Sequence, residues 1–231
     1  MGHRAIIFDL FGTLVNGFMS VTGQTQEQFA AILGVPCEPF TKLWREITGR
    51  RTVGEFQTVE ASIEHVCGAL GISVNAEQMA KAVEFRLEYT KRALTPKADA
   101  VKTLENLKQS GFKIGLLSNC SIEIPVLWSE TEFADLIERP VFSSRERLKK
   151  PDPRIYHLAC ERLGVSPKDC VYVADGENYE LTAAGEVGMH SVLIRNSSLD
   201  DGKEILREAR EWRGATIQTL TEVPILLNTC T

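Results

Sequence analysis

The stretch RAIIFDLFGTLV, residues 4–15, places a carboxylate at the end of an apolar run. The run AIIF predicts a short strand that is buried on both faces, as in a parallel sheet. Gly12 and Thr13 then predict a turn. In open α/β sheets ligands bind beyond the carboxyl ends of the strands, so Asp9 would stand where such a fold places its chemistry. The alternative is that Asp9 only caps a following helix.

Composition is typical of a packed globular protein. The chain has 231 residues, of which 43% are apolar and 25% are charged. This length suits one domain with a large insertion, or two small domains. The net charge is −5, and no block of about five like charges occurs, so we expect no nucleic-acid partner and no anionic-membrane partner. No apolar run approaches the roughly 18 residues that a membrane-spanning helix needs.

Six cysteines are scattered along the chain without a CxxC pair. This pattern favours reduced thiols in a cytosolic protein over a disulfide framework or a zinc site. The first predicted strand begins so early that we expect no signal peptide, and we predict a cytoplasmic location. The sequence leaves the oligomeric state open.

From about residue 22 to residue 94 the sequence shows helical periodicity and no strand pattern. Glycines close several of the apolar stripes, and Asn75 with Gln78 resembles a capping box. We therefore predict a small all-helical unit of four helices. Its apolar stripes are Phe29/Ile32/Leu33, Phe40/Leu43/Trp44/Ile47, Ile63/Val66/Cys67/Leu70 and Met79/Val83/Leu87.

After residue 95 the pattern alternates between helices and strands. Predicted strands end at Ser118, near residue 143 and at Asp175, and further strand–helix pairs follow. Such alternation predicts an α/β fold with a doubly wound parallel, Rossmann-like sheet. We expect residues 1–15 and 95–231 to form this core, with residues 16–94 inserted as a smaller helical cap.

Polar residues follow the predicted strands at three places. Asp9 ends the first, Ser118-Asn119 the second and Asp175 a later one, while Lys150 precedes a proline and a helix. The carboxyl ends of parallel strands meet at one edge, so these groups should lie together. A carboxylate can act as a nucleophile, an ammonium can neutralise developing negative charge, and paired carboxylates suit Mg²⁺.

These motifs resemble those of the haloacid dehalogenase (HAD) superfamily, and the resemblance covers almost the whole chain, including the helical insertion. The stretches that carry it are DLFGTLV (9–15), LLSN (116–119), KPDPRIY (150–156) and VADGENYELTAA (173–184). The resemblance implies a hydrolase with a helical cap, acting on a small anionic molecule. Fold alone does not fix the reaction or the substrate.

The resemblance also implies roles for individual residues. Asp9 would be the nucleophile of a covalent intermediate, and Lys150 would orient Asp9 and screen charge. Ser118 and Asn119 would hold the transferring group, and we expect Gly12 and Thr13 to help bind the substrate.

The same resemblance implies a magnesium site. Asp9, the carbonyl of Phe11 and Asp175 would hold Mg²⁺, and Glu180 falls where a second acid is usual in the fourth motif. Two facing acids are hard to explain without a cation, because like charges so close together raise one pKa.

Phe11 leaves the reaction open. Most phosphatases of the superfamily carry a second Asp at this position, which protonates the leaving group, and the loss of a general acid typically costs about 10²–10⁴-fold. An aromatic residue here resembles the 2-haloacid dehalogenases, which use no metal and carry Ser-Asn-x-x-Asp in the fourth motif. Because this chain keeps acids there, we predict a Mg²⁺-dependent phosphatase-like hydrolase. The alternatives are a metal-free dehalogenase, or a binding protein with little turnover.

Dehalogenases of the superfamily also use a cap arginine to bind the substrate carboxylate. Arg45, Arg50 and Arg51 are the candidates in this sequence, with Arg45 and Arg50 as the predicted substrate contacts. Arg50 and Arg51 are expected in a turn after Gly49. A guanidinium suits a carboxylate or a phosphate equally.

Overall fold

A computed structural model describes residues 3–20, 26–195 and 207–229 of the chain. All of its strands belong to one parallel sheet, in the order β3-β2-β1-β4-β5-β6. This confirms the predicted α/β fold with a Rossmann-like sheet. The strands are β1 (Ala5–Phe8), β2 (Lys113–Ser118), β3 (Arg139–Phe142), β4 (Cys170–Ala174), β5 (His190–Ile194) and β6 (Ala215–Ile217).

Strand β1 lies in the middle of the sheet, between β2 and β4. All four of its side chains are fully buried. Ile6 and Phe8 belong to the apolar cluster on one face of the sheet, and Ala5 and Ile7 belong to the cluster on the other. A strand covered on both faces needs a continuous apolar run, which explains the sequence AIIF.

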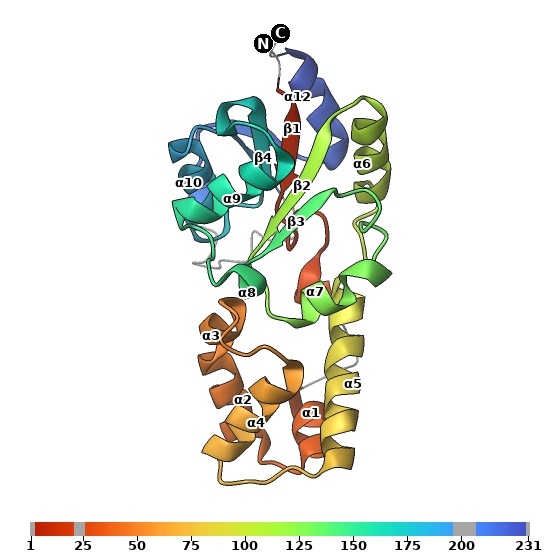
Figure 1. Cartoon of the computed structure of the whole chain (residues 1–231), viewed down its shortest axis with the longest axis vertical. Coiled ribbons are helices and arrows are strands. Elements are labelled where there is room, and N and C mark those ends of the chain that lie inside the picture. Colours follow the sequence, from red (N-terminus) through yellow and green to blue (C-terminus); the bar gives the residue numbers. More distant parts are fainter. Residues whose placement is uncertain (1–2, 21–25, 196–206, 230–231) are drawn as a thin grey trace.

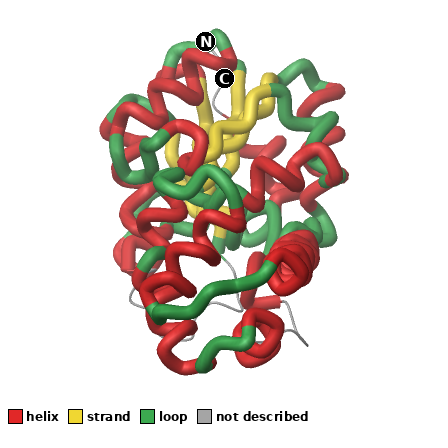
Figure 2. Tube along the Cα trace, turned by 60° about the horizontal axis from the view of Figure 1, so that its bottom comes forward, coloured by secondary structure: helices red, strands yellow, loops and turns green. Residues whose placement is uncertain are grey.

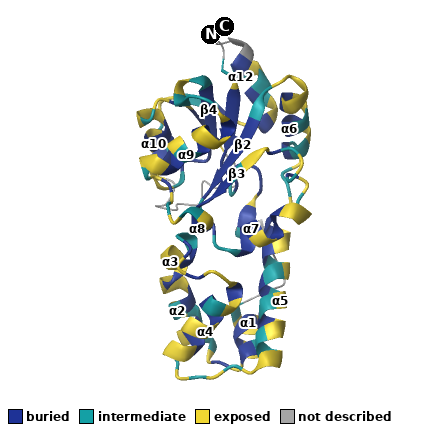
Figure 3. Ribbon diagram, viewed as in Figure 1, coloured by how far each residue is buried: buried dark blue, intermediate teal, exposed yellow. Residues whose placement is uncertain are grey.

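Helices cover both faces of the sheet, and the strands between them are buried (Figures 1 and 3). Helices α6 and α12 contribute to one apolar cluster, and α9 and α10 contribute to the other. The helices of this part are α6 (Ala100–Gln109), α7 (Glu123–Leu127), α8 (Ser143–Glu146), α9 (Pro153–Leu163), α10 (Glu180–Glu186), α11 (Arg207–Glu211) and α12 (Val223–Thr229).

The helices between β1 and α6 form a separate group, which lies beyond one end of the sheet (Figures 1 and 2). They have an apolar cluster of their own, centred on Phe29, Phe40, Trp44 and Ile63. The capping box of Asn75 and Gln78 is confirmed at the start of the last helix. The helices are α1 (Gln26–Leu33), α2 (Cys37–Glu46), α3 (Thr48–Thr52), α4 (Val59–Ala69) and α5 (Ala76–Ala93).

The prediction of a turn after Gly49 is wrong. The chain forms the short helix α3, because Arg51 N donates to Ile47 O at 2.9 Å and Val53 N donates to Gly49 O at 3.2 Å. This additional helix carries Arg50 and Arg51 on different sides, which matters for the site.

The chain leaves and re-enters the sheet region at neighbouring points. Val15 forms isolated bridges with Phe11 and with Pro96, and Lys97 N donates to Leu14 O at 2.9 Å. This closure supports the division into a core and a helical cap, which we retain as a proposal. In the part of the chain described, no helix is long and apolar enough to cross a membrane. The cysteines there carry free thiols, and Cys230 lies outside it.

Candidate active site

Asp9 and Asp175 meet because β1 and β4 are neighbours in the sheet. Asp9 N donates to Val173 O at 2.9 Å, so Asp9 directly continues the pairing of the two strands. Both carboxylates are buried, with 5% and 8% of their surface exposed. The interpretation of Asp9 as no more than a helix cap fails, since a 3-10 helix (Gly17–Ser20) is the next helical segment of the chain.

Lys150 connects the acids of the site. Its Nζ donates to Asp9 Oδ1 and to Glu180 Oε2, each at 2.5 Å, and to the hydroxyl of Tyr172 at 3.1 Å. Asn119 fixes the lysine backbone: its Nδ2 donates to Lys150 O at 3.0 Å, and its Oδ1 accepts from Lys150 N at 2.8 Å. The Asn119 amide is therefore engaged by Lys150, although this residue also lines the adjoining cavity.

Tyr172 is a site residue that the sequence analysis missed. Its hydroxyl donates to Glu180 Oε2 at 2.7 Å, and the hydroxyl of Tyr156 donates to Glu180 O at 3.0 Å. Tyr172 lies inside the predicted strand CVYVAD as one more apolar residue. Only the packing of β4 against α9 and α10 shows that its hydroxyl reaches the acids.

Asp9, Asp175 and Glu180 form a cluster with the geometry of a cation site. Each offers a carboxylate oxygen, and these oxygens all lie within 4.8 Å of one another. Burial, then the charges of Glu180 and Asp9, raise the pKa of Asp175 well above its usual range. Burial also raises the pKa of Asp9 to about 7, against the opposing effect of Lys150.

With its carboxyls ionised, this cluster carries an excess of negative charge. Glu177 adds a further acid at its border, and the positive groups are Lys150 and Lys97, whose Nζ donates to Gly12 O at 2.5 Å. With all groups ionised, four carboxylates face two ammonium groups, which leaves two negative charges in excess. Asp175 Oδ1 is also buried without a hydrogen-bond partner among the described residues. Hard oxygen ligands with this excess charge fit Mg²⁺.

Gly12 allows the turn after β1 to approach Asp175. It adopts φ +78°, and a Cβ atom at this position would lie 2.0 Å from Asp175 Oδ2. Any other residue would therefore displace that carboxylate. Phe11, one residue earlier, lines the adjoining cavity and contacts the ring of Phe18 at 5.3 Å between centroids.

Two hydroxyls predicted to bind the substrate are buried beside these acids. Thr13 follows the Gly12 turn, and Ser118 is the last residue of β2. Neither Thr13 Oγ1 nor Ser118 Oγ has a hydrogen-bond partner in the described parts of the chain. Buried hydroxyls without partners are rare in folded proteins, so both side chains fit a role in binding an oxygen-rich group.

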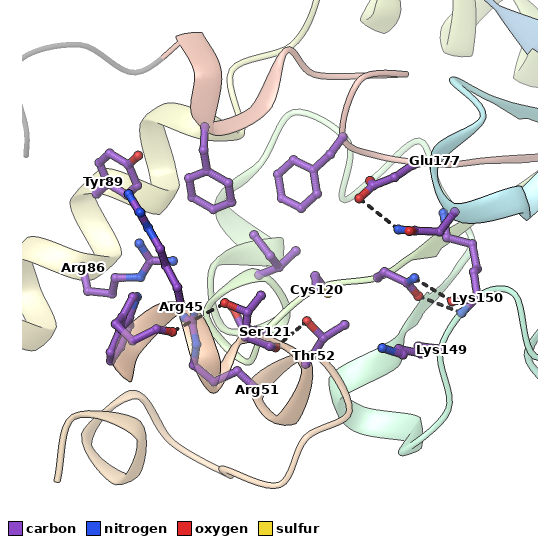
Figure 4. A pocket seen from close by; sticks show the side chains of 18 of the residues that line it. Arg45, Arg51, Thr52, Arg86, Tyr89, Cys120, Ser121, Lys149, Lys150 and Glu177 are labelled. Carbon is purple, nitrogen blue, oxygen red and sulfur yellow. Dashed lines mark hydrogen bonds between the residues drawn. The ribbon is translucent and has the colours of Figure 1, made fainter. Parts of the chain in front are cut away.

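A cavity of about 700 Å³ separates this edge of the sheet from the cap. Figure 4 shows Lys150 and Glu177 on one side of the cavity, with Arg86 and Tyr89 on the other. Arg45, Arg51 and Arg86 are its arginines. The cap therefore contributes positive charge opposite the acids.

The structure does not support the prediction that Arg50 contacts the substrate, because Arg50 does not line the cavity. Arg50 is exposed and donates to Glu55 Oε2 at 2.6 Å, and its Nη1 lies 2.9 Å from Nε2 of His65. The physical reason is the helical course of α3, which directs Arg51 inward and Arg50 outward. Arg86 was missed, although it lies three residues after Val83 on the apolar stripe of α5, which was a usable signal.

Arg51 and Arg86 share one buried carboxylate. Arg86 Nε donates to Glu123 Oε1 at 2.8 Å, and Arg51 Nη1 lies 3.5 Å from the same oxygen. Glu123 lies on α7, whereas Arg51 and Arg86 lie on α3 and α5, so this cluster joins the helical group between β1 and α6 to the region of the sheet. Burial alone would raise the pKa of Glu123, but Arg86 and Arg51 outweigh it and lower that pKa to about 2.

Replacing Glu123 by glutamine should make the free energy of unfolding depend less on pH in the acid range. In the wild type, ionised Glu123 stabilises the folded protein fully above its unfolded pKa near 4.5. This stabilisation is lost as the pH falls toward 2, and the pKa shift corresponds to about 3 kcal/mol of unfolding free energy. The variant should therefore be less stable at pH 7, and the gap should narrow below pH 4. Urea unfolding at several pH values measures this gap. Glu130→Gln, which breaks an exposed pair with Lys91, is the matched control, and a gap that stays constant with pH would contradict the assignment.

Known proteins resemble this chain over most of its length. (S)-2-haloacid dehalogenase 4A of Burkholderia cepacia is 29% identical over 83% of this chain and 82% of its own. Phosphatase MT3486 of Mycobacterium tuberculosis is 26% identical over 87% and 92%. A solved HAD phosphatase from Thermococcus onnurineus is 24% identical over 97% of both chains with a TM-score of 0.66, which shows the shared fold.

The family assignment rests on a match to a family model, which covers most of the chain. A family model described as haloacid dehalogenase-like hydrolase matches residues 3–188. That range contains every acid of the site, Lys150 and the whole helical insertion. The chain therefore belongs to the haloacid dehalogenase-like hydrolases.

Proposed function

We propose that this hydrolase cleaves small phosphate monoesters in a Mg²⁺-dependent reaction with Asp9 as the nucleophile. The observation that carries the proposal is the buried Asp175 Oδ1, which lacks a partner in the described residues and lies in a cluster with two negative charges in excess. Burying unpaired charge is costly, so such a cluster indicates a bound cation.

In the proposed first step an oxygen of Asp9 attacks the phosphorus atom. A bond forms between Asp9 and phosphorus, the ester P–O bond breaks, and the electron pair leaves on the alcohol oxygen. Lys150 holds Asp9 Oδ1, which leaves Oδ2 to attack. Ser118 and Thr13 would donate their hydroxyls to the phosphoryl oxygens. Mg²⁺ held by Asp9, Asp175, Glu180 and the carbonyl of Phe11 would neutralise phosphoryl charge.

In the proposed second step water attacks the phosphorus of the aspartyl phosphate. Inorganic phosphate is released and Asp9 is restored as a carboxylate. Phe11 has no acidic proton to donate to the leaving alcohol, so this proton must come from solvent. We therefore expect a preference for substrates with acidic leaving groups, such as aryl phosphates.

A second candidate is the hydrolysis of a 2-haloacid without metal. Phe11 favours it, since a halide leaves without a proton, and a cap arginine suits a carboxylate. The names of the matched relatives, several of which are (S)-2-haloacid dehalogenases, give it more support than they give a phosphatase. Asp175 and Glu180 count against it, because acids facing Asp9 repel an anionic substrate unless a cation is bound.

A substrate panel separates the two candidates. 4-Nitrophenyl phosphate and 2-chloropropionate would each be tested with Mg²⁺ and with EDTA. The proposal expects phosphate release that EDTA abolishes. Chloride release that persists in EDTA, without phosphate release in Mg²⁺, would establish the second candidate instead.

Replacing Asp175 by asparagine should weaken Mg²⁺ binding at least about tenfold, since even outer partners of a metal site cost that much. The amide keeps the shape of the side chain, so the melting temperature without metal should not fall. Titration calorimetry with Mg²⁺ measures the affinity. Asp135→Asn, the same change at an exposed position, is the control. Unchanged affinity in Asp175→Asn would remove the main support for the phosphatase proposal.

A further inference from the structure

The cap side of the cavity holds a buried guanidinium, Arg51, two of whose nitrogens donate no hydrogen bond within the described residues. Arg51 is 7% exposed, and neither its Nε nor its Nη1 has a hydrogen-bond partner in the described residues. Its contact with Glu123 is an ion pair at 3.5 Å without hydrogen-bond geometry. Buried N–H groups are almost always satisfied, so this arginine indicates a missing acceptor.

The charges around Arg51 also call for an anion. Arg51 and Arg86 share Glu123, which leaves one positive charge in excess. Burial, then Arg86, lower the pKa of Arg51 to about 10, so it remains a cation at neutral pH. A further carboxylate from a ligand would restore the balance.

The guanidinium of Arg51 is held in a fixed orientation. It lies 4.3 Å from the centroid of the Trp44 ring, and Arg86 lies 5.3 Å from the rings of Phe18 and Tyr89. Such stacking restricts an arginine before its ligand arrives, and a planar fork matches a carboxylate. These features are those of a binding site that is formed before its ligand arrives.

The position of this site relative to Lys150 constrains the shape of the ligand. In Figure 4, Arg86 and Tyr89 lie across the cavity from Lys150 and Glu177. Phe11, Phe18 and Ile124 contribute apolar surface to the same cavity. A ligand that spans it would carry an anion at each end and an apolar middle.

We propose that Arg51, fixed beside Arg86 and Glu123, binds a second anionic group of the substrate, and that the substrate class is a phosphate monoester bearing a distal carboxylate on an apolar, preferably aromatic, spacer. This inference rests on the proposed function for the phosphate end. The carboxylate end depends only on the cap residues.

The test compares two non-hydrolysable probes, 4-phosphonobenzoate and phenylphosphonate, by calorimetry with Mg²⁺ present. They differ only in the distal carboxylate. Wild-type protein should bind 4-phosphonobenzoate at least about tenfold more tightly, as expected for hydrogen bonds to a charged group. Arg51→Gln should lose this preference and leave phenylphosphonate binding unchanged. Arg50→Gln, the neighbouring exposed arginine, should keep the preference.

Hydrolysis gives a second readout. For 4-carboxyphenyl phosphate, Arg51→Gln should raise KM about tenfold with little change in kcat, whereas KM for phenyl phosphate should stay the same. If Arg51→Gln does not fold, Arg51→Lys is tested instead. It should still bind 4-phosphonobenzoate more tightly than phenylphosphonate, but by a smaller factor than the wild type does. A wild-type protein that does not discriminate between the probes overturns the proposal without any variant.

The two proposals fail in different ways. If the preference for 4-phosphonobenzoate depends on Arg51 but neither phosphate ester is hydrolysed, the anion site stands and the proposed reaction is wrong. If both esters are hydrolysed equally and Arg51→Gln changes neither KM, the reaction stands and the anion site is wrong.

Discussion

Asp9→Asn should abolish turnover, by at least about 10⁴-fold, on every substrate that the wild-type protein hydrolyses. The amide is a poor nucleophile, and neither proposed reaction proceeds without a covalent bond to this residue. The fold should persist, because the amide oxygen can still accept from Lys150 Nζ, which donates at 2.5 Å in the wild type.

Stability provides the control for this variant. Burial raises the pKa of Asp9 to about 7 from an ordinary value of 3.8, so its ionised form costs stability as the pH rises through that window. A neutral side chain removes this cost, and the melting temperature at pH 8 should not fall. Initial rates and thermal unfolding of the same preparation measure both effects. Wild-type turnover by Asp9→Asn would refute the nucleophile assignment.

Lys150→Met should be the most destabilising of the substitutions at this site. Burial alone would lower the pKa of Lys150, but Asp9 and Glu180 outweigh it and raise that pKa. Removing the ammonium leaves two carboxylates buried without their partner, and breaking a buried pair in this way typically costs about 3–5 kcal/mol. Activity should fall as well, since Lys150 lowers the pKa of Asp9 and its removal would leave a smaller share of Asp9 ionised.

Urea unfolding in EDTA measures this effect without a contribution from bound metal. Lys149→Met is the matched control, because Lys149 is the exposed neighbour and should change stability by no more than about 0.5 kcal/mol. Equal stability of the two variants would mean that Asp9 and Glu180 are not held by Lys150 in the folded protein.

Strand ends were predictable because their signals are local. A four-residue apolar run before Asp9, the strand that ends at Ser118, and the strand before Asp175 each appear in a short window of sequence. The parallel α/β rule then brings the ends to one edge, and the pairing of β1 with β2 and β4 agrees. The helical stripes around Phe29 and Trp44 were predictable for the same reason.

Residues whose roles depend on partners far away in the sequence were harder to predict. Glu123 meets Arg86 across 37 residues of sequence, and no local pattern pairs them. Tyr172 reads as an apolar strand residue until α10 brings Glu180 against its hydroxyl. Arg50 and Arg51 are adjacent in the same motif, and only the path of α3 decides which one enters the cavity.

The sequence by itself therefore determined the positions of the main strands along the chain and the polar residues at their ends, because apolar periodicity and turn residues act over a few positions, and its short motifs indicated the family. Only the tertiary structure decided which cap arginine is buried, how Lys150 divides its hydrogen bonds between Asp9 and Glu180, and that Asp175 keeps an oxygen without a described partner. These features depend on burial and on charges from separate segments, and both quantities exist only once the chain has packed.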